Sequence, residues 1–454
     1  MLGNKEKNKQ ILRYVLPSVS AMIVSFTYNM VDGMFVGQGV GPSALASVNL
    51  AMPFTQIMTG IASMLAIGGA TAMAIYKGKE DTKRANQVFL TSTLLVIIAG
   101  LFITGVGFFA STQIARLFGA TELLLGQTAT YIKWYSLFSI FFTASILGNA
   151  FVRNDGSPEL AFWGMIVGAL SNIFLDWLFI FPLQMGIKGA AIASGLGQLL
   201  SCLVLAFHFL RKKGILRIER FSVNVKQCRE VIVCGLPEFV IQISQPMTIF
   251  CYNLVILHYL GESGLTAFAG VTYMMVIMLG VFFGISQGLQ PLIGTSFGRR
   301  ETHKVNYYFR AGLLINLILS TLLYSIYVLI GPYALKLFIT DNTLIPLAYT
   351  ALKWYGLAYI PAAINIIYIT YFLSIRKSGQ AFWISCSRGI VLNCLLIFTL
   401  PALFGIKLIW LPLLIAESLT LIFATLLKKR KSTKNIIADR TEDCLEKRIS
   451  QDNL

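Results

Sequence analysis

The chain has 454 residues, of which 56% are hydrophobic and only 13% are charged. Soluble domains average about 25% charged residues, so this composition excludes a soluble globular protein and predicts an all-α polytopic membrane protein. The net charge of +17 does not indicate nucleic-acid binding, because the basic residues flank hydrophobic blocks. The seven cysteines form no CxxC pair and no Cys/His ligand spacing, which argues against a disulfide framework or a metal cluster.

Twelve apolar segments of spanning length follow one another, six before and six after a basic stretch. The first six are predicted at 11–36, 44–76, 86–110, 124–152, 159–182 and 188–210. The second six are predicted at 231–260, 264–296, 306–331, 346–374, 381–404 and 407–427. We expect an N-lobe over 1–215, a basic cytoplasmic linker over 216–230, a C-lobe over 231–427 and a charged cytoplasmic tail over 428–454.

Twelve spans place both termini on the same side of the membrane. Six of the 37 Lys and Arg residues lie on the opposite side, namely Arg116, Lys133, Lys188, Lys336, Lys353 and Lys407. The remaining 31 lie on the side of the termini, with Arg388 counted as close to that face. The positive-inside rule therefore predicts cytoplasmic termini and a multi-pass protein of the cell inner membrane.

The second half of the chain repeats the first at an offset of 220 residues. This offset places the tripeptide KWY of 133–135 on 353–355, and AFW of 161–163 on 381–383. Two tripeptides that contain Trp do not share a register through lipid-like composition alone. The chain is therefore predicted to be a duplicated six-helix unit. Because six is even, the two pseudo-symmetric six-helix bundles cross the membrane in the same direction around a central cavity. This architecture suits alternating access, although a channel can also be duplicated.

Two carboxylates lie inside predicted spans of the first half, and neither has a counterpart in the second half. Asp32 aligns with Tyr252, and Asp176 aligns with Leu396. A charged side chain at bilayer depth costs several kcal/mol, so it indicates a functional site that faces a cavity. The structural alternative is that Asp32 lies just beyond its span and is wetted by headgroup water.

The spacing of these polar residues predicts one shared layer in the N-lobe. Measured from the cytoplasmic ends of their spans, Asp32 lies about 30 Å and Asp176 about 26 Å along the helix. Asn172 precedes Asp176 by four residues and shares its helical face, and Ser194 lies about 9 Å from the outer end of the sixth span. Carboxylate, amide and hydroxyl oxygens suit a small cation, and two acids in a low dielectric do not easily both ionise. We therefore expect a site for a proton or a small cation. An interfacial Asp176 and a helix-bridging Asn172 are the alternative.

Several stretches of the chain resemble one known family. They are the LPS of the first span with its in-span Asp, the connection VGQGVGPSALASVNLAMP, the segment GGATAMAIYKGKEDTKRAN, and the Asn-x-x-x-Asp of the fifth span. From about Ile11 to Leu427 the chain is similar to the multidrug and toxic compound extrusion (MATE) family, and within it to the bacterial MepA-like branch. The resemblance implies a V-shaped pair of six-helix bundles. It also implies export of organic, often cationic amphiphilic, compounds against a proton or sodium gradient.

The resemblance also implies roles for individual residues. The cation-coupling residues that it implies are Asp32, Asn172, Asp176 and Ser194. The first three would hold the ion as metal ligands if that ion is sodium. The resemblance further implies that Pro17 bends the first span. One branch of the family carries acids in the seventh and tenth spans, but here the seventh-span position is Gln245 and the tenth span has no acid. This difference argues against coupling through the C-lobe.

Further polar residues in the second half are candidates for a substrate cavity. They are Gln245, Gln287, Gln290, Glu238 and Glu417. Glu238 also fits a solvated cytoplasmic end, and Glu417 also fits an ion pair with a basic neighbour. The two eighth-span glutamines also fit helix-to-helix contacts. Aromatic and Met side chains that face the cavity would suit flat hydrophobic cations.

We therefore expect a cation-coupled antiporter that acts as a monomer in the lipid bilayer and exports small organic cations or drugs. It would need no cofactor besides the coupling proton or sodium ion. The alternative is a lipid-linked precursor flippase, which requires several basic residues in the cavity, with Arg388 and Arg310 as the in-span candidates. A passive channel or scaffold does not explain why the acids Asp32 and Asp176 have no counterparts in the other lobe. An enzyme is not expected, because the sequence shows no nucleophile, metal or acid-base constellation.

Overall fold

The computed structural model describes residues 5–212, 214–217, 224–336, 339 and 341–429. The first half contains α1 (Lys5–Gly39), α2 (Pro42–Gly78), α3 (Thr82–Phe109), α4 (Ser111–Leu117), α5 (Glu122–Ser136), α6 (Ser139–Asn154), α7 (Pro158–Ile180) and α8 (Gly186–Leu210). The second half contains α9 (Val225–Gly298), α10 (Thr302–Leu335), η1 (Asn342–Leu344), α11 (Ile345–Leu357), α12 (Tyr359–Ser374), α13 (Ser378–Cys386), η2 (Ser387–Val391), α14 (Leu392–Phe404), η3 (Ile406–Leu408) and a last helix over 412–429. Residues 218–223 of the predicted linker and the predicted tail from 430 onward lie outside the described residues.

The described helices account for the predicted membrane spans. Nine are long and apolar enough to cross a membrane, or ten when α5 and α6 are taken as one bent span. α9 is itself two helices that meet at Gly261, whose φ of 65° and ψ of −159° interrupt the helical path. The division at Gly261, together with the helix at 412–429 that covers most of the predicted twelfth segment, brings the number of helical segments to the predicted twelve. The prediction of an all-α polytopic membrane protein is confirmed.

Two spans are each built from two helices, a feature that the hydrophobic pattern did not predict. α5 and α6 meet at a bend of 53°, directly after the KWY of 133–135. α11 and α12 are separated at Ala358, directly after the KWY of 353–355. The two breaks therefore occupy the same place in the repeat.

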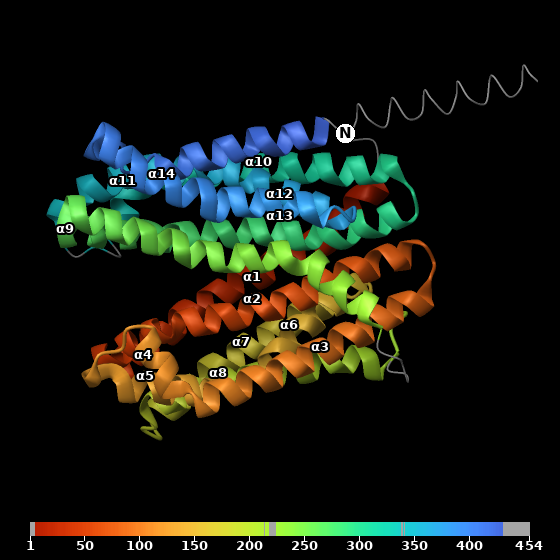
Figure 1. Ribbon diagram of the computed structural model, residues 1–454, viewed down its shortest axis with the longest axis horizontal. Coiled ribbons are helices and arrows are strands. Elements are labelled where there is room, and N and C mark those ends of the chain that lie inside the picture. Colours follow the sequence, from red (N-terminus) through yellow and green to blue (C-terminus); the bar gives the residue numbers. More distant parts are fainter. Residues whose placement is uncertain (1–4, 213, 218–223, 337–338, 340, 430–454) are drawn as a thin grey trace, which may run out of the picture.

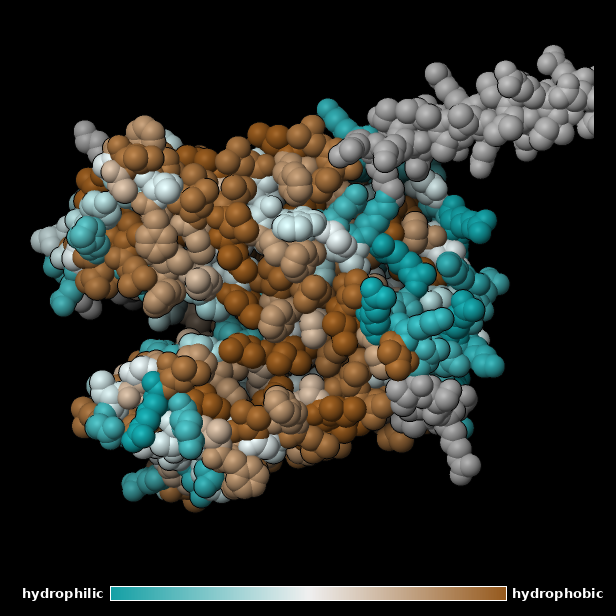
Figure 2. Space-filling model, viewed as in Figure 1, coloured by the Kyte–Doolittle hydropathy of each residue, from teal (hydrophilic) through white to brown (hydrophobic). Residues whose placement is uncertain are grey.

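The helices form two lobes, an N-lobe from α1 to α8 and a C-lobe from α9 to the last helix (Figure 1). The lobes meet at the end where α2 turns into α3 and α9 turns into α10, and they separate towards α4, α5 and α11. Figure 2 shows the separation as a notch in the surface, and it shows hydrophilic side chains gathered at the closed end. The V-shaped pair of bundles is therefore present, with the notch at the end opposite the hydrophilic one.

The two lobes touch through glycines at equivalent positions of the repeat. A Cβ atom on Gly68 of α2 would lie 2.7 Å from the amide nitrogen of Gly235 in α9. A Cβ atom on Gly288 of α9 would lie 2.7 Å from the Cα atom of Val15 in α1. The 220-residue offset relates these two contacts, so the second span of each lobe packs against the first span of the other. Small residues are what allow helix backbones to approach this closely in a membrane.

A third glycine contact lies at the closed end. A Cβ atom on Gly78 would lie 2.9 Å from the Cα atom of Gly298, and the reverse distance is also 2.9 Å. Nearby, Thr71 of α2 is fully buried and accepts a hydrogen bond of 2.7 Å from Gln290 of α9. The closed end therefore depends on direct backbone contact between the lobes.

Replacing Gly298 by Leu should open the closed end, because a Cβ atom there would lie 2.2 Å from the carbonyl oxygen of Ile75. In a cysteine-free background that carries Thr71→Cys, we expect a membrane-permeant maleimide to react several-fold faster when Gly298→Leu is added. Gly105→Leu is the matched control, because a Cβ atom on Gly105 meets nothing within 4 Å. Equal labelling rates with and without Gly298→Leu would contradict the role of this contact.

Candidate functional site

The packing of α7 against α8 positions two of the predicted site residues. A Cβ atom on Gly197 of α8 would lie 2.8 Å from the carbonyl oxygen of Gly168 and 3.0 Å from the Cβ atom of Asn172. At this close approach the Asn172 Nδ2 atom donates a hydrogen bond of 3.3 Å to the Ser194 hydroxyl. The two residues that the sequence placed in one layer are therefore in direct contact.

The two acids of the N-lobe lie together at this place. Asp176 is one turn beyond Asn172 on α7 and is 0% exposed, which is not the burial of an interfacial residue. Asp32 on α1 is half-buried, and its carboxyl group is close enough to interact directly with that of Asp176. Asp176 also interacts with the side chain of Asn172. The three helices α1, α7 and α8 thus bring all four predicted residues into one cluster, which we call the acid site.

Four buried oxygens of the acid site have no hydrogen-bond donor among the described residues. They are Asp32 Oδ1, Asn172 Oδ1, Asp176 Oδ1 and Asp176 Oδ2. A buried acceptor without a donor costs about 1–3 kcal/mol, and more when it is charged. Two facing carboxyl groups can form a hydrogen bond with each other only when one of them holds a proton. A shared proton or a small hard cation would therefore satisfy this arrangement.

A cation in the acid site would rest on two carboxylates and neutral oxygens. In the part of the chain that the structure describes, no three His, Cys, Asp or Glu side chains converge in a way that could hold a metal ion. Carboxylate, amide and hydroxyl oxygens are hard ligands, and they suit a weakly held alkali ion better than a tightly held transition metal. The donor set therefore fits a proton or a weakly held alkali ion.

Three tyrosines near the acid site were not predicted from the sequence. Tyr28 lies one turn before Asp32 on α1, and Tyr131 and Tyr135 lie on α5 with ring centroids 5.5 Å apart. All three are within electrostatic range of the Asp32 carboxyl group. The four-residue spacing from Tyr28 to Asp32 is a sequence signal for a shared face. Tyr131 and Tyr135 come close only through the packing of α5 in the bundle, for which the sequence carries no local signal.

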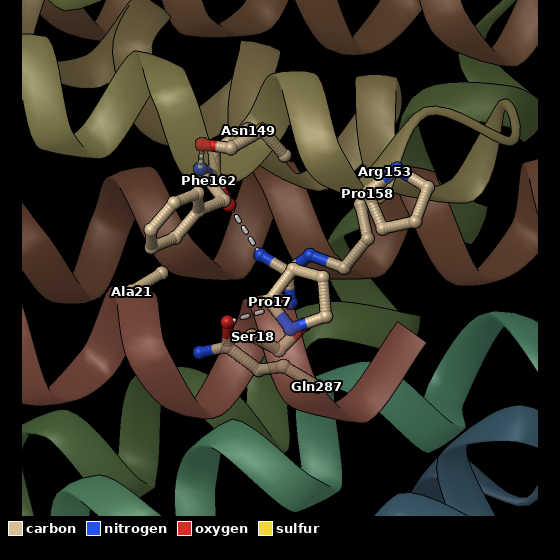
Figure 3. A pocket seen from close by; sticks show the side chains of 9 residues that line it. Pro17, Ser18, Ala21, Asn149, Arg153, Pro158, Phe162 and Gln287 are labelled. Carbon is tan, nitrogen blue, oxygen red and sulfur yellow. Dashed lines mark hydrogen bonds between the residues drawn. The ribbon is translucent and has the colours of Figure 1, made fainter. Parts of the chain in front are cut away.

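Pro17 lies inside α1, which continues on both sides of it as one helix. It borders a small cavity at the closed end that Asn149, Arg153 and Gln287 also line (Figure 3). Arg153 Nη1 donates a hydrogen bond of 2.7 Å to Gln287 Oε1 of the C-lobe, and Nη2 donates to Asn149. Because proline lacks an N–H, it removes one helical hydrogen bond of α1 beside this link between the lobes.

The two eighth-span glutamines lie at the closed end. Gln287 accepts the hydrogen bond from Arg153, and Gln290 donates to Thr71 and accepts from Asn154 Nδ2 at 3.1 Å. In this conformation both side chains therefore belong to the contact between the lobes and not to the open cavity.

Gln245 and Glu417 line one cavity of the C-lobe, which we call the C-lobe cavity. Its volume is about 760 Å³, including the solvent space at its mouth. Glu417 is 3% exposed and forms an ion pair with Arg388, with 2.7 Å between Oε1 and Nη2. Both expectations for Glu417, a cavity wall and an ion pair with a basic neighbour, therefore hold together. Glu238 is half-buried on α9, does not line this cavity, and forms no hydrogen bond or ion pair with a described residue.

The position expected for Arg388 is corrected by the structure. The charge count placed it close to the cytoplasmic face, but it lies in η2, well inside the span that runs from Ser378 to Phe404. It lines the C-lobe cavity. Its buried ion pair with Glu417 explains how a charged residue is tolerated at this depth.

Comparison with known protein families supports the repeat. The family model described as MatE matches residues 17–178 and 237–399. The two matches begin 220 residues apart, which is the offset found in the sequence.

Curated relatives match the chain over nearly its whole length. The multidrug export protein MepA of Staphylococcus aureus (strain bovine RF122 / ET3-1) is 24% identical over 422 residues, which cover 92% of this chain and 93% of the relative. The protein of the same name from Staphylococcus saprophyticus is 24% identical over 424 residues, with the same coverage.

Solved structures share the fold. An outward-facing multidrug resistance MATE family transporter of the MOP superfamily superposes with a TM-score of 0.89 at 22% identity, over 94% of this chain and 96% of that chain. A MOP superfamily transporter from Pyrococcus furiosus superposes with a TM-score of 0.87 at 23% identity, over 94% and 96%. Since the two matches of the family model together span more than half of the sequence, the chain belongs to the MatE family of membrane transporters.

Proposed function

We propose that this chain is a cation-coupled antiporter that exports amphiphilic organic compounds, small organic cations or drugs among them, by alternating access. Its family and its similarity to proteins named for multidrug export support the export of such compounds. The observation that carries the coupling is the set of four buried oxygens in the acid site that have no hydrogen-bond donor among the described residues. The coupling ion is a proton or a sodium ion, and Asp32, Asn172, Asp176 and Ser194 bind it.

The acid site acts on the rest of the protein through α1. This helix carries Asp32 at one end, Pro17 in its first half and, at Val15, the contact with Gly288 of the C-lobe. Binding of the ion neutralises the acid site and rearranges α1 near Pro17, which weakens the binding of the drug. The drug leaves outward, and the emptied carrier turns inward and releases the ion. Ion binding can drive transport because the ion binds one conformation of the carrier better than the other.

The C-lobe takes no part in ion coupling in this proposal. Tyr252 stands where the N-lobe has Asp32, is fully buried, and its hydroxyl accepts a hydrogen bond of 3.0 Å from the Leu413 amide. That tyrosine anchors the start of the last helix. Among the described residues that line the C-lobe cavity, Arg388 is the one basic side chain, which does not match the several cations that a lipid-linked precursor flippase requires.

The orientation that we propose for the protein in the membrane follows from the distribution of its basic residues. Both termini lie in the cytoplasm, the notch between the lobes opens outward, and the protein works as a monomer in the cell inner membrane. Basic residues concentrated in the connections at the closed end support this orientation.

Replacing Asp32 by Asn should abolish gradient-driven efflux, because the amide keeps the shape of the side chain but cannot take up a proton or offset a cation. Efflux of ethidium from proteoliposomes under an imposed pH or sodium gradient measures this, and the gradient that drives the wild type identifies the ion. Glu122→Gln makes the same chemical change at a side chain that is 87% exposed, and it should transport like the wild type. Uphill export by Asp32→Asn would show that Asp32 does not couple transport to the ion.

The coupling ion should also protect the folded protein against heat. A ligand present at about 100 times its Kd stabilises the native state by about 2.7 kcal/mol. If the ion is sodium, we expect the thermal unfolding midpoint of the detergent-purified wild type to rise with sodium concentration but not with potassium concentration. If the ion is a proton, we expect the midpoint to rise with proton concentration at constant salt. Asp176→Asn should lose most of that rise. An equal rise of the unfolding midpoint in wild type and variant would show that the ion does not bind at the acid site.

A further inference from the structure

The C-lobe cavity contains a guanidinium group with an unused hydrogen-bonding face. We propose that this face of Arg388 binds the carboxylate, or another anionic group, of an aromatic compound. The inference rests on the proposed export function and adds aromatic anions to the organic compounds that it names. It differs from the cationic substrates that the family resemblance implies.

The carboxylate of the cavity is fully engaged by the protein. Glu417 Oε1 accepts hydrogen bonds from Arg388 Nη2 at 2.7 Å and from Nε at 3.0 Å. Its Oε2 atom accepts from Asn365 Nδ2 at 2.7 Å and from Arg388 Nε at 3.2 Å. A cationic ligand would therefore find both carboxylate oxygens occupied and a positive charge beside them.

The guanidinium, in contrast, is only partly engaged. Arg388 donates to Glu417 through Nε and Nη2, and in the described part of the chain no residue accepts a hydrogen bond from Nη1. Arg388 lines the cavity, so the unused N–H groups are available to a ligand. A guanidinium carries five N–H donors in a planar fork that matches a carboxylate. Arg388 can thus hold Glu417 on one edge and a ligand anion on another.

The local backbone holds Arg388 in place. It lies in η2, a π-helical turn, and such turns are frequent at functional sites. The Thr248 hydroxyl donates a hydrogen bond of 3.3 Å to the carbonyl of Gly389, and Asn393 Nδ2 donates one of 2.9 Å to the carbonyl of Arg388. Asn393 Oδ1 and the Ser385 hydroxyl are buried polar atoms of the cavity-lining residues that have no partner among the described residues.

The repeat shows that the fold does not need charged side chains at the positions of Arg388 and Glu417. Asn365 and Glu417 correspond to Ser145 and Gln198 of the N-lobe, at offsets of 220 and, after one deletion, 219 residues. There the Ser145 hydroxyl donates a hydrogen bond of 2.5 Å to Gln198 Oε1, so a neutral pair makes the equivalent contact. Arg388 corresponds to Gly168. Because a buried ion pair adds little net stability over a neutral pair, the charges of the C-lobe point to ligand recognition.

The remaining wall of the cavity suits a flat aromatic body. Phe283, Tyr355 and Tyr359 line it, and the ring centroids of the two tyrosines are 5.8 Å apart. Shape and charge together favour an aromatic compound with one anionic group directed at Arg388.

Three matched fluorescent probes test the inference: pyrene-1-carboxylate, pyrene-1-methanol and pyrene-1-methylammonium. Fluorescence anisotropy with the full-length protein in detergent measures their affinities without any ion gradient, so the result does not depend on coupling. We expect the carboxylate to bind about ten- to a hundredfold more tightly than the ammonium, the range that hydrogen bonds to a charged group supply. Equal binding of the three probes, or tighter binding of the ammonium, would overturn the inference.

Variants assign this preference to Arg388. The double variant Arg388→Gln/Glu417→Gln leaves no unpaired buried charge and imitates the neutral pair of the N-lobe, and it should lose the preference for the carboxylate. Arg310→Gln removes an exposed arginine of α10 and should bind all three probes like the wild type. If the double variant keeps the carboxylate preference, Arg388 is not the binding group. If Asp32→Asn still drives export while these binding results hold, coupling through the acid site fails and this inference stands.

Discussion

The contact of helix backbones between the two lobes is the constraint on which the rest of the structure depends. Gly68 meets Gly235, and Gly288 meets Val15, at distances that leave no room for a Cβ atom on Gly68 or Gly288. These contacts join the second span of each lobe to the first span of the other. They close one end of the molecule and let the lobes separate at the other end (Figure 1). In lipid, where apolar surfaces gain little from meeting each other, such close packing is what holds helices together.

The duplicated scaffold carries an uneven distribution of charge. The N-lobe has two facing acids whose buried oxygens have no donor in the described part of the chain, whereas the C-lobe has a tyrosine and a leucine at those positions. The C-lobe has an ion pair between Arg388 and Glu417, whereas the N-lobe has a glycine and a glutamine there. Duplication therefore supplied two similar bundles, and polar substitutions gave each bundle a different chemistry. α1 connects the two, because it carries Asp32 and also packs against α9.

The candidate site was predictable where helical periodicity controls it. Asn172 and Asp176 share a face because they are four residues apart, and depth along each span placed Asp32 in the same layer. The structure brings these residues together with Ser194. Tyr131 and Tyr135 were not predictable, because their approach depends on how α5 packs in the bundle. Arg388 was misplaced because a charge near an apolar span resembles a cytoplasmic flank until its buried partner is known.

Length, hydrophobic pattern and the repeat determined by themselves that this protein has twelve spans in two related bundles, and that Asp32 and Asp176 of the first bundle have no counterparts in the second. These features are local or periodic along the chain, so they can be read without knowing which helices touch. Only the tertiary structure decided which polar residues face a cavity and which face another helix. Gln290 binds the opposite lobe, while Gln245 lines the C-lobe cavity. The physical reason is that the environment of a side chain depends on the rotation and packing of neighbouring helices, which residues far away in the sequence control.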